Sequence, residues 1–173
     1  MMAPPDAETA LLMSYLTGQR NHVLGALDGL DDEELRRPVL PSEWSCLGLV
    51  QHLTLDVERF WFRAVVAGEP AVIDGLGAAS DNAWDVGSDV SAESVLSLYR
   101  EEIKRADAVI GATQLDSAPV WWPADLFGDW RIDNLRQVLL HVIVETACHA
   151  GHLDAARELI DGTQWLVLTG DGG

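Results

Sequence analysis

The strongest constraint on this fold is a helical run of about thirty residues near the C-terminus, RIDNLRQVLLHVIVETACHAGHLDAARELIDG. Asp133 is suited to cap its first turn, and Gly162 is suited to end it. The pattern predicts a helix over residues 133–161. Apolar and small residues recur at three- and four-residue steps along one broad side of that helix: Leu135, Val138, Leu139, Val142, Thr146, Leu153, Ala156 and Ile160.

Three earlier segments show the same periodicity, so we expect an all-α fold. Polar capping residues precede each segment, Gly68 follows the second, and a short helical turn closed by Pro38 lies between the first two. With the C-terminal run, these segments predict a four-helix bundle with long crossover loops, forming a single domain over residues 1–173. The three predicted helices span residues 6–29, 45–67 and 91–112, with Asp6, Ser45 and Ser91 as their start signals.

The connections between these helices are long. Residues 68–90 show no lasting period and are expected to form a loop, and loops of this length often cover a site. A second irregular stretch, TQLDSAPVWWPADLFGDW, carries three of the seven tryptophans. Only QWLVLTG has β character, and the GDGG tail is expected to be disordered. The tryptophans suit either a pocket or ordinary core and rim positions: Trp61, Trp121, Trp122 and Trp130.

The charge of the chain argues against two classes of partner. The 173 residues carry a formal net charge of -17, which repels nucleic-acid phosphates and anionic membranes alike. The N-terminal sequence has no basic leader, so we expect a cytoplasmic protein. Cys46 and Cys148 form no CxxC motif and are expected to be free and reduced, with Cys148 buried and inert and Cys46 packed against Trp44.

The long C-terminal helix carries an unusual polar group within its apolar pattern. Glu145 and His149 are four residues apart, so on an α-helix they lie about 40° apart in azimuth and can grip one metal ion. His52, on the second predicted helix, can supply a third ligand and leave coordination positions open. His141 extends the stripe by one turn, as an alternative ligand or as a partner that orients one. A solvated helix face would carry the same Glu and His pair without a metal.

Other polar residues near these positions have more than one interpretation. His152 and Asp56 are candidates for orienting a ligand or moving a proton. Arg59 and Arg63 continue the flank of His52 and Asp56 at α-helical spacing, and they suit either the carboxylate of a cofactor or solvated ion pairs. His22 is expected at the surface.

Two segments together resemble a known superfamily. PSEWSCLGLVQHLTLDVERFWFRAVVAGE is followed about seventy residues later by LRQVLLHVIVETACHAGHLDAARELIDG. The Trp-Ser lead-in, the histidine of the second helix, the following ER-W pattern and the His-Gly-His run resemble the DinB/YfiT-like superfamily of metal-dependent enzymes, especially an actinobacterial branch. The resemblance covers most of the chain.

This resemblance implies a four-helix bundle that binds a divalent metal, often zinc or nickel, through positions matching His52, Glu145 and His149. Many relatives have histidine where Glu145 stands, whereas the mycothiol-dependent maleylpyruvate isomerases have glutamate. The chain departs from that branch at Val144, Thr146 and Cys148, which leaves the substrate open.

The function that the resemblance implies is that of an S-transferase or isomerase. It would join or rearrange a small electrophile with a low-molecular-weight thiol such as mycothiol, bacillithiol or glutathione. The alternative is a non-catalytic bundle that binds a metal or small ligand and forms a homodimer through an apolar helix face, in a stress or regulatory role.

Overall fold

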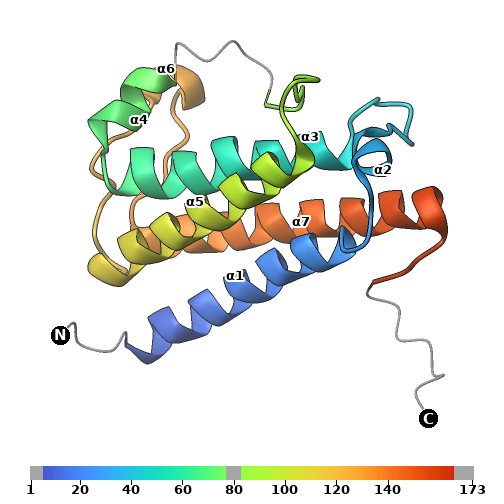
Figure 1. Cartoon of the computed structure of the whole chain (residues 1–173). Coiled ribbons are helices and arrows are strands. Elements are labelled where there is room, and N and C mark those ends of the chain that lie inside the picture. Colours follow the sequence, from blue (N-terminus) through green and yellow to red (C-terminus); the bar gives the residue numbers. More distant parts are fainter. Residues whose placement is uncertain (1–5, 77–82, 166–173) are drawn as a thin grey trace.

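The computed structural model describes residues 6–76 and 83–165, and every regular element within those ranges is a helix (Figure 1). The all-α prediction is confirmed for these ranges. Most of the β-like segment and the whole GDGG tail lie outside the described residues. The elements in chain order are α1 (Ala7–Ala26), α2 (Asp32–Arg36), α3 (Cys46–His52), η1 (Leu53–Val66), α4 (Pro70–Gly75), α5 (Ala92–Ala112), α6 (Ala124–Phe127) and α7 (Leu135–Asp161).

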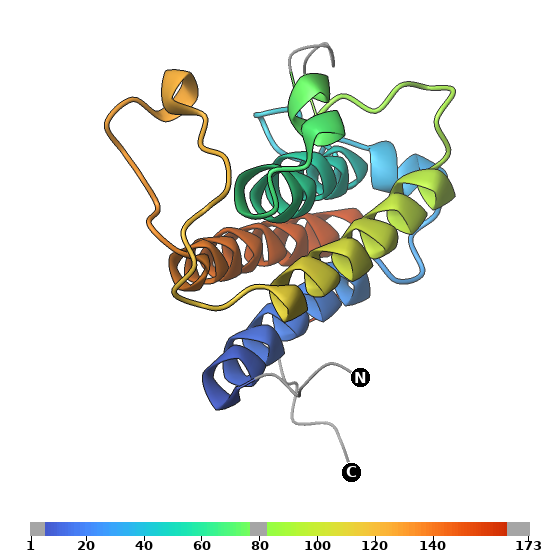
Figure 2. The same cartoon turned by 90° about the vertical axis from the view of Figure 1, so that its left-hand side faces the viewer.

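Four long helical segments lie alongside one another: α1, α3 with η1, α5, and α7 (Figures 1 and 2). Helix α7 packs against α1 on one side and η1 on another, and α5 packs against α3 and η1. Their facing apolar side chains are removed from solvent, and this burial stabilises the fold. The most completely buried, at 0% exposure, include Leu16, Val23, Leu47, Leu49, Phe62, Val138, Leu139, Val142 and Leu153. None of the helices in the described part of the chain is long and apolar enough to cross a membrane.

Most of the predicted helix ends are confirmed by side-chain caps. Asp6, Ser45 and Ser91 each accept a hydrogen bond from the backbone N–H three residues ahead. Gly162 adopts a left-handed φ of 80° and ends α7. The Asp133 cap is wrong by one residue, because the side chain of Asn134 accepts the Gln137 N–H at 3.0 Å.

The predicted end of the first helix, at residue 29, is three residues too late. The α1 helix ends at Ala26. The guanidinium of the buried Arg157 donates to the carbonyls of Ala26 and Asp28 at 2.9 and 2.7 Å, just where the helix ends. These bonds satisfy carbonyl groups at the end of the helix that have no partner within it. Sequence periodicity does not show this contact because the two residues are far apart in the chain.

The second long helix changes type directly after His52. In η1 the hydrogen bonds run from residue i to i−5, as in the 3.0 Å bond from Ala67 N–H to the carbonyl of Phe62. A π-helix turns by about 82° per residue, against about 100° in an α-helix. Side chains seven and eleven positions after His52 are therefore turned to the opposite side, whereas α-helical spacing would align them with it.

The predicted loop over residues 68–90 is partly helical. Gly68, with φ of 64°, ends the preceding helix, and Pro70 starts α4 with a fixed φ suited to a first helical turn. Within the second irregular stretch, residues 124–127 form the short helix α6. Helix α4 packs against η1, whereas Leu126 and Phe127 of α6 line a cavity beside η1.

Charged side chains form a closed network inside the helices. Arg20 of α1 donates two 2.6 Å hydrogen bonds to Glu58 of η1 and one of 2.8 Å to Asp107 of α5. Arg20 and Glu58 are nearly inaccessible, with side chains 3% and 1% exposed. Nearby, His22 is buried and its Nε2 lies 2.7 Å from Asp154 of α7, so the prediction of a surface histidine is wrong. These pairs join α1 to its three neighbouring segments.

Candidate metal site

Three side chains from two helices converge at one point between the end of α3 and α7. His52 ends α3, and Glu145 and His149 lie one turn apart on α7. The Oε1 atom of Glu145 lies 3.2 Å from His149 Nε2 and 4.0 Å from His52 Nε2. One ligand atom from each residue lies within 4.8 Å of the other two. The structure therefore brings together the three residues that the sequence singled out.

This spacing fits a divalent ion. Bonds of about 2.1 Å arranged tetrahedrally place neighbouring ligand atoms about 3.4 Å apart, between the two distances found here. Two imidazoles and one carboxylate suit zinc, nickel and related metals. Three protein ligands leave further coordination positions open, as catalytic metal sites require. The side chains are partly sheltered, at 15% exposure for His52, 13% for His149 and 38% for Glu145.

The orientation of His52 is fixed from two sides. Its Nδ1 lies 2.9 Å from Asp56 Oδ2, so Nδ1 carries the proton that the carboxylate accepts and Nε2 is left facing Glu145. The indole of Trp84 stacks on the imidazole with a centroid distance of 4.4 Å and an angle of 17°. Asp56 therefore lies where the sequence suggested an orienting partner for His52.

The His149 ring is held in its neutral form. Burial lowers its pKa, and the neighbouring His52 lowers it further, against an opposing effect of Glu145. Its Nδ1 is buried and has no hydrogen-bond partner among the residues that the structure describes. A neutral imidazole has a free lone pair, which is the form that binds metals.

A cavity of about 350 Å³ opens beside these ligands. His52 and Glu145 form part of its wall together with His141. The rest of the described lining is mainly apolar and aromatic, from η1 and α6: Asp56, Val57, Phe60, Trp61, Leu126 and Phe127. The π-helical turn explains this face, because side chains four, five, eight and nine positions after His52 all point to its side at about 82° per residue.

His141 lies in this cavity among aromatic rings. Its ring centroid is 4.6 Å from Trp61 and 5.7 Å from Trp130. Burial lowers the pKa of His141, although the charge of Glu145 partly opposes that shift. His141 is therefore a neutral side chain in the cavity wall, with a nitrogen able to accept a proton. Of the four tryptophans considered from the sequence, Trp61 lines the cavity directly.

Arg59 and Arg63 do not face the candidate metal site. Both donate to the fully buried carboxylate of Glu102 on α5, at 3.0 Å for Arg59 and 2.9 Å for Arg63. Burial raises the pKa of Glu102, but hydrogen bonds from the two guanidiniums outweigh this and lower it overall. The prediction that these arginines share the flank of His52 is wrong, because the π-helix turns them away.

Two more predictions need correction or a narrower statement. Cys148 is exposed, not buried, because it lies about 100° from His149 and points away from the neighbouring helices. Cys46 is buried, as expected for a packed residue. His152 is exposed, with its ring centroid 5.6 Å from His149, so it lies at the edge of the site.

Sequence reasoning missed Trp84, which contacts both histidines: its ring is stacked on His52 and lies edge-on to His149 at 5.7 Å. The position falls in a loop without periodicity, and the only signal for it was that long loops often cover sites. Leu126 and Phe127 were missed for the same reason.

These observations define a helical protein with a candidate two-histidine, one-glutamate metal site beside an aromatic cavity. A family model described as Mycothiol-S-transferase matches residues 11–162. The chain belongs to this mycothiol-S-transferase family, which lies within the DinB/YfiT-like superfamily, so the resemblance drawn from the sequence is confirmed. A search of curated proteins finds no match.

Proposed function

We propose that this protein is a metal-dependent mycothiol S-transferase that joins the thiol to a small electrophile. His52, Glu145 and His149 hold one divalent ion, with zinc and nickel as the leading choices. The chain acts as one domain over residues 1–173, in which the four long segments form the helical bundle typical of the superfamily. The convergence of these three side chains beside an open cavity carries the proposal.

The proposed chemistry divides between the ion and the chain. A bound divalent ion supplies a positive charge that lowers the pKa of a thiol and favours the nucleophilic thiolate. Asp56 holds His52 in the tautomer that presents Nε2 to the site. His141 can accept the proton that the thiol loses, because burial keeps its imidazole neutral.

The aromatic cavity takes the electrophile. Phe60, Trp61 and Phe127 pack edge-to-face or stacked with centroid distances between 5.1 and 6.1 Å, so they form a rigid apolar wall. Such a wall binds an apolar group and excludes water from the reacting thiolate. The electrophile is therefore expected to be a small molecule with an apolar or aromatic portion.

A homodimer is a further part of the proposal, and exposed apolar residues support it. Leu140 and Val144 are 49% and 68% exposed on α7. Leu11 and Tyr15 are 56% and 60% exposed on α1, and the Arg136–Glu8 ion pair sets the two helices in a register that brings these residues to the same level. Light scattering on Val144→Glu against the wild-type protein tests this, with a shift from dimer to monomer expected.

A conjugation assay tests the enzymatic proposal. The zinc- or nickel-reconstituted protein is mixed with mycothiol and a fluorogenic alkylating electrophile. We expect metal-dependent turnover that falls at least ~100-fold in His52→Ala and Glu145→Gln. Glu101 on α5, whose side chain is 47% exposed, provides the matched control, Glu101→Gln, which is expected to retain wild-type turnover.

The same assay with glutathione and bacillithiol completes the test. Turnover with none of the three thiols, in protein that holds its metal, would contradict the transferase proposal. That result would favour the alternative function, a non-catalytic dimer that binds a metal or ligand.

A further inference from the structure

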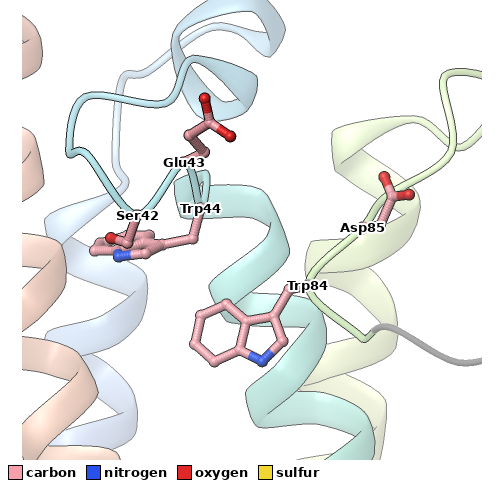
Figure 3. Close-up of a pocket in the computed structure, with 5 residues that line it drawn as sticks. All are labelled: Ser42, Glu43, Trp44, Trp84 and Asp85. Carbon is pink, nitrogen blue, oxygen red and sulfur yellow. The ribbon is translucent and has the colours of Figure 1, made fainter.

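A second cavity, of about 520 Å³, is also lined by Trp84 (Figure 3). Trp44 and Trp84 form its aromatic part, with ring centroids 6.5 Å apart and planes at 62°. Ser42, Glu43 and Asp85 complete the described lining, and Figure 3 shows both carboxylates above the two indoles in that view. None of the three candidate metal ligands is among these lining residues.

This cavity is one indole away from the candidate metal site. Trp84 forms a wall of the cavity, and the same indole stacks on His52. The ring centroid of Trp44, the other aromatic wall, lies 6.3 Å from that of His152. The His152 centroid is in turn 5.6 Å from that of His149. A molecule seated in this cavity, against the two indoles, can therefore extend a short arm to the ligand cluster.

The Trp84 wall is held in place by α3. The backbone carbonyl of Trp84 approaches Gly48 so closely that a Cβ added at Gly48 would lie 2.2 Å from its oxygen. The Gln51 side chain donates to the carbonyls on both sides of Trp84, at 3.0 Å to Ala83 and 3.3 Å to Asp85. Trp84 is thus fixed by a residue without a side chain and by a two-point hydrogen bond.

The opposite wall carries an unusual backbone. Glu43 has a φ of 60°, and in the described part of the chain it is the one non-glycine residue with a positive φ. This conformation is strained for a residue with a side chain, and such strain concentrates at ligand-binding positions. It accompanies the placement of the Glu43 carboxylate on the lining of the cavity.

We infer that the cavity lined by Trp44 and Trp84 binds the sugar and cyclitol portion of the thiol substrate. This inference rests on the proposed transferase function. The C–H groups of a sugar ring pack on the electron-rich faces of indoles, and carboxylates accept hydrogen bonds from hydroxyls. Mycothiol carries its cysteine on an uncharged glucosaminyl-inositol unit, which presents both kinds of group.

The same cavity discriminates against other thiols. Glu43 and Asp85 place two carboxylates on its lining, and no Lys or Arg is among the described lining residues. Glutathione carries two carboxylates of its own, so like-charge repulsion disfavours it. The cavity therefore selects the thiol by its carrier, whereas the aromatic cavity beside His141 selects the electrophile.

Binding of the free carrier tests this inference without any turnover. The probe is N-acetylglucosaminyl-inositol, which keeps the uncharged amide of mycothiol and lacks the cysteine, and it is titrated into the full-length protein by calorimetry. We expect Trp44→Ala to weaken its binding about tenfold, and Trp44→Phe to restore most of it. Trp165, which is 47% exposed and not part of the cavity lining, gives the matched control, Trp165→Ala, with unchanged binding.

The outcomes separate this inference from the proposed function. Equal binding of the probe by wild type and a folded Trp44→Ala, or no binding to wild type, would overturn the carrier site even if conjugation proceeds. Trp44-dependent probe binding without any conjugation would leave the carrier site standing and remove the transferase. Glu43→Gln with Asp85→Asn is expected to lower the KM for glutathione and leave its kcat unchanged, and an unchanged KM would contradict the role of the two carboxylates.

Discussion

Two clusters of polar and charged side chains, Arg20–Glu58–Asp107 and His52–Glu145–His149, differ in how their charges are satisfied. The Arg20–Glu58–Asp107 group is closed: its hydrogen bonds are 2.6 to 2.8 Å long, and its central side chains are almost inaccessible. The His52–Glu145–His149 group is open: its ligand atoms face one another at 3.2 and 4.0 Å, and a cavity lies beside them.

This difference in how the charges are satisfied distinguishes a structural ion-pair network from a group of side chains that is open to a ligand. In the closed cluster the one guanidinium, that of Arg20, is matched by the carboxylates of Glu58 and Asp107. In the open cluster two imidazoles lie beside one carboxylate, and His149 retains a buried nitrogen without a partner in the described chain. Groups arranged in this way are stabilised by a cation.

Breaking the closed cluster is expected to give the largest change in stability. Arg20→Met leaves the Glu58 carboxylate buried without its bidentate partner, which costs about 3–5 kcal/mol in the free energy of unfolding. Urea denaturation followed by circular dichroism measures this. Metal affinity of the folded fraction should stay at the wild-type value, and a parallel loss of metal affinity would show that the two clusters are coupled.

Weakening the open cluster should lower metal affinity and leave the stability of the fold almost unchanged. Asp56→Asn removes the carboxylate that accepts the His52 Nδ1 proton, and the loss of such orienting partners lowers metal affinity by about 10- to 100-fold. Because Asp56 is 54% exposed, the unfolding midpoint of the metal-free protein should hardly move. Competition with a chromogenic chelator measures the affinity, and wild-type affinity in Asp56→Asn would contradict the orienting role.

The pH dependence of stability tests the ion pairs of Glu102, which forms a second closed cluster with Arg59 and Arg63. Its pKa in the folded protein is lowered, so it stabilises the fold above the ordinary glutamate pKa of 4.5, and this contribution is lost as the pH falls below that value. Unfolding curves between pH 6 and pH 3 should show wild type losing more stability than Glu102→Gln. Parallel curves for the two proteins would rule out the lowered pKa.

The smallest expected effect is a difference in labelling rate between the two cysteines, which depends on how exposed and how ionised each thiol is. Burial raises the pKa of the Cys46 thiol to about 11, so about 0.1% of it is ionised at pH 8. Cys148 is exposed on α7 next to His149. Iodoacetamide followed by mass spectrometry should therefore label Cys148 first, at least ~10 times faster than Cys46. Labelling of Cys46 at the same rate would mean that α3 opens readily.

Local sequence signals were enough to predict most helix ends and the candidate ligands. Asp6, Ser45, Ser91 and Gly162 act through bonds within a few residues, so periodicity and capping chemistry locate them. Glu145 and His149 are related by helix geometry alone, which holds because α7 is a regular α-helix around them.

The errors arise where contacts are not local. The π-helical turn of η1 cannot be distinguished from an α-helix by its apolar residues, so the direction of Arg59 was predicted wrongly. His22 is buried through a partner 132 positions later in the chain, and Trp84 reaches His52 from a loop. Exposure of Cys148 depends on which face of α7 its neighbours leave uncovered.

Calorimetric titration of zinc or nickel into metal-free protein tests directly whether His52, Glu145 and His149 hold a divalent ion. We expect one ion per chain in wild type and in Glu101→Gln, and loss of that binding in Glu145→Gln and His149→Ala, with all four proteins folded. The absence of a stoichiometric ion in wild type would contradict the proposed metal site. So would an unchanged affinity after removal of Glu145 or His149.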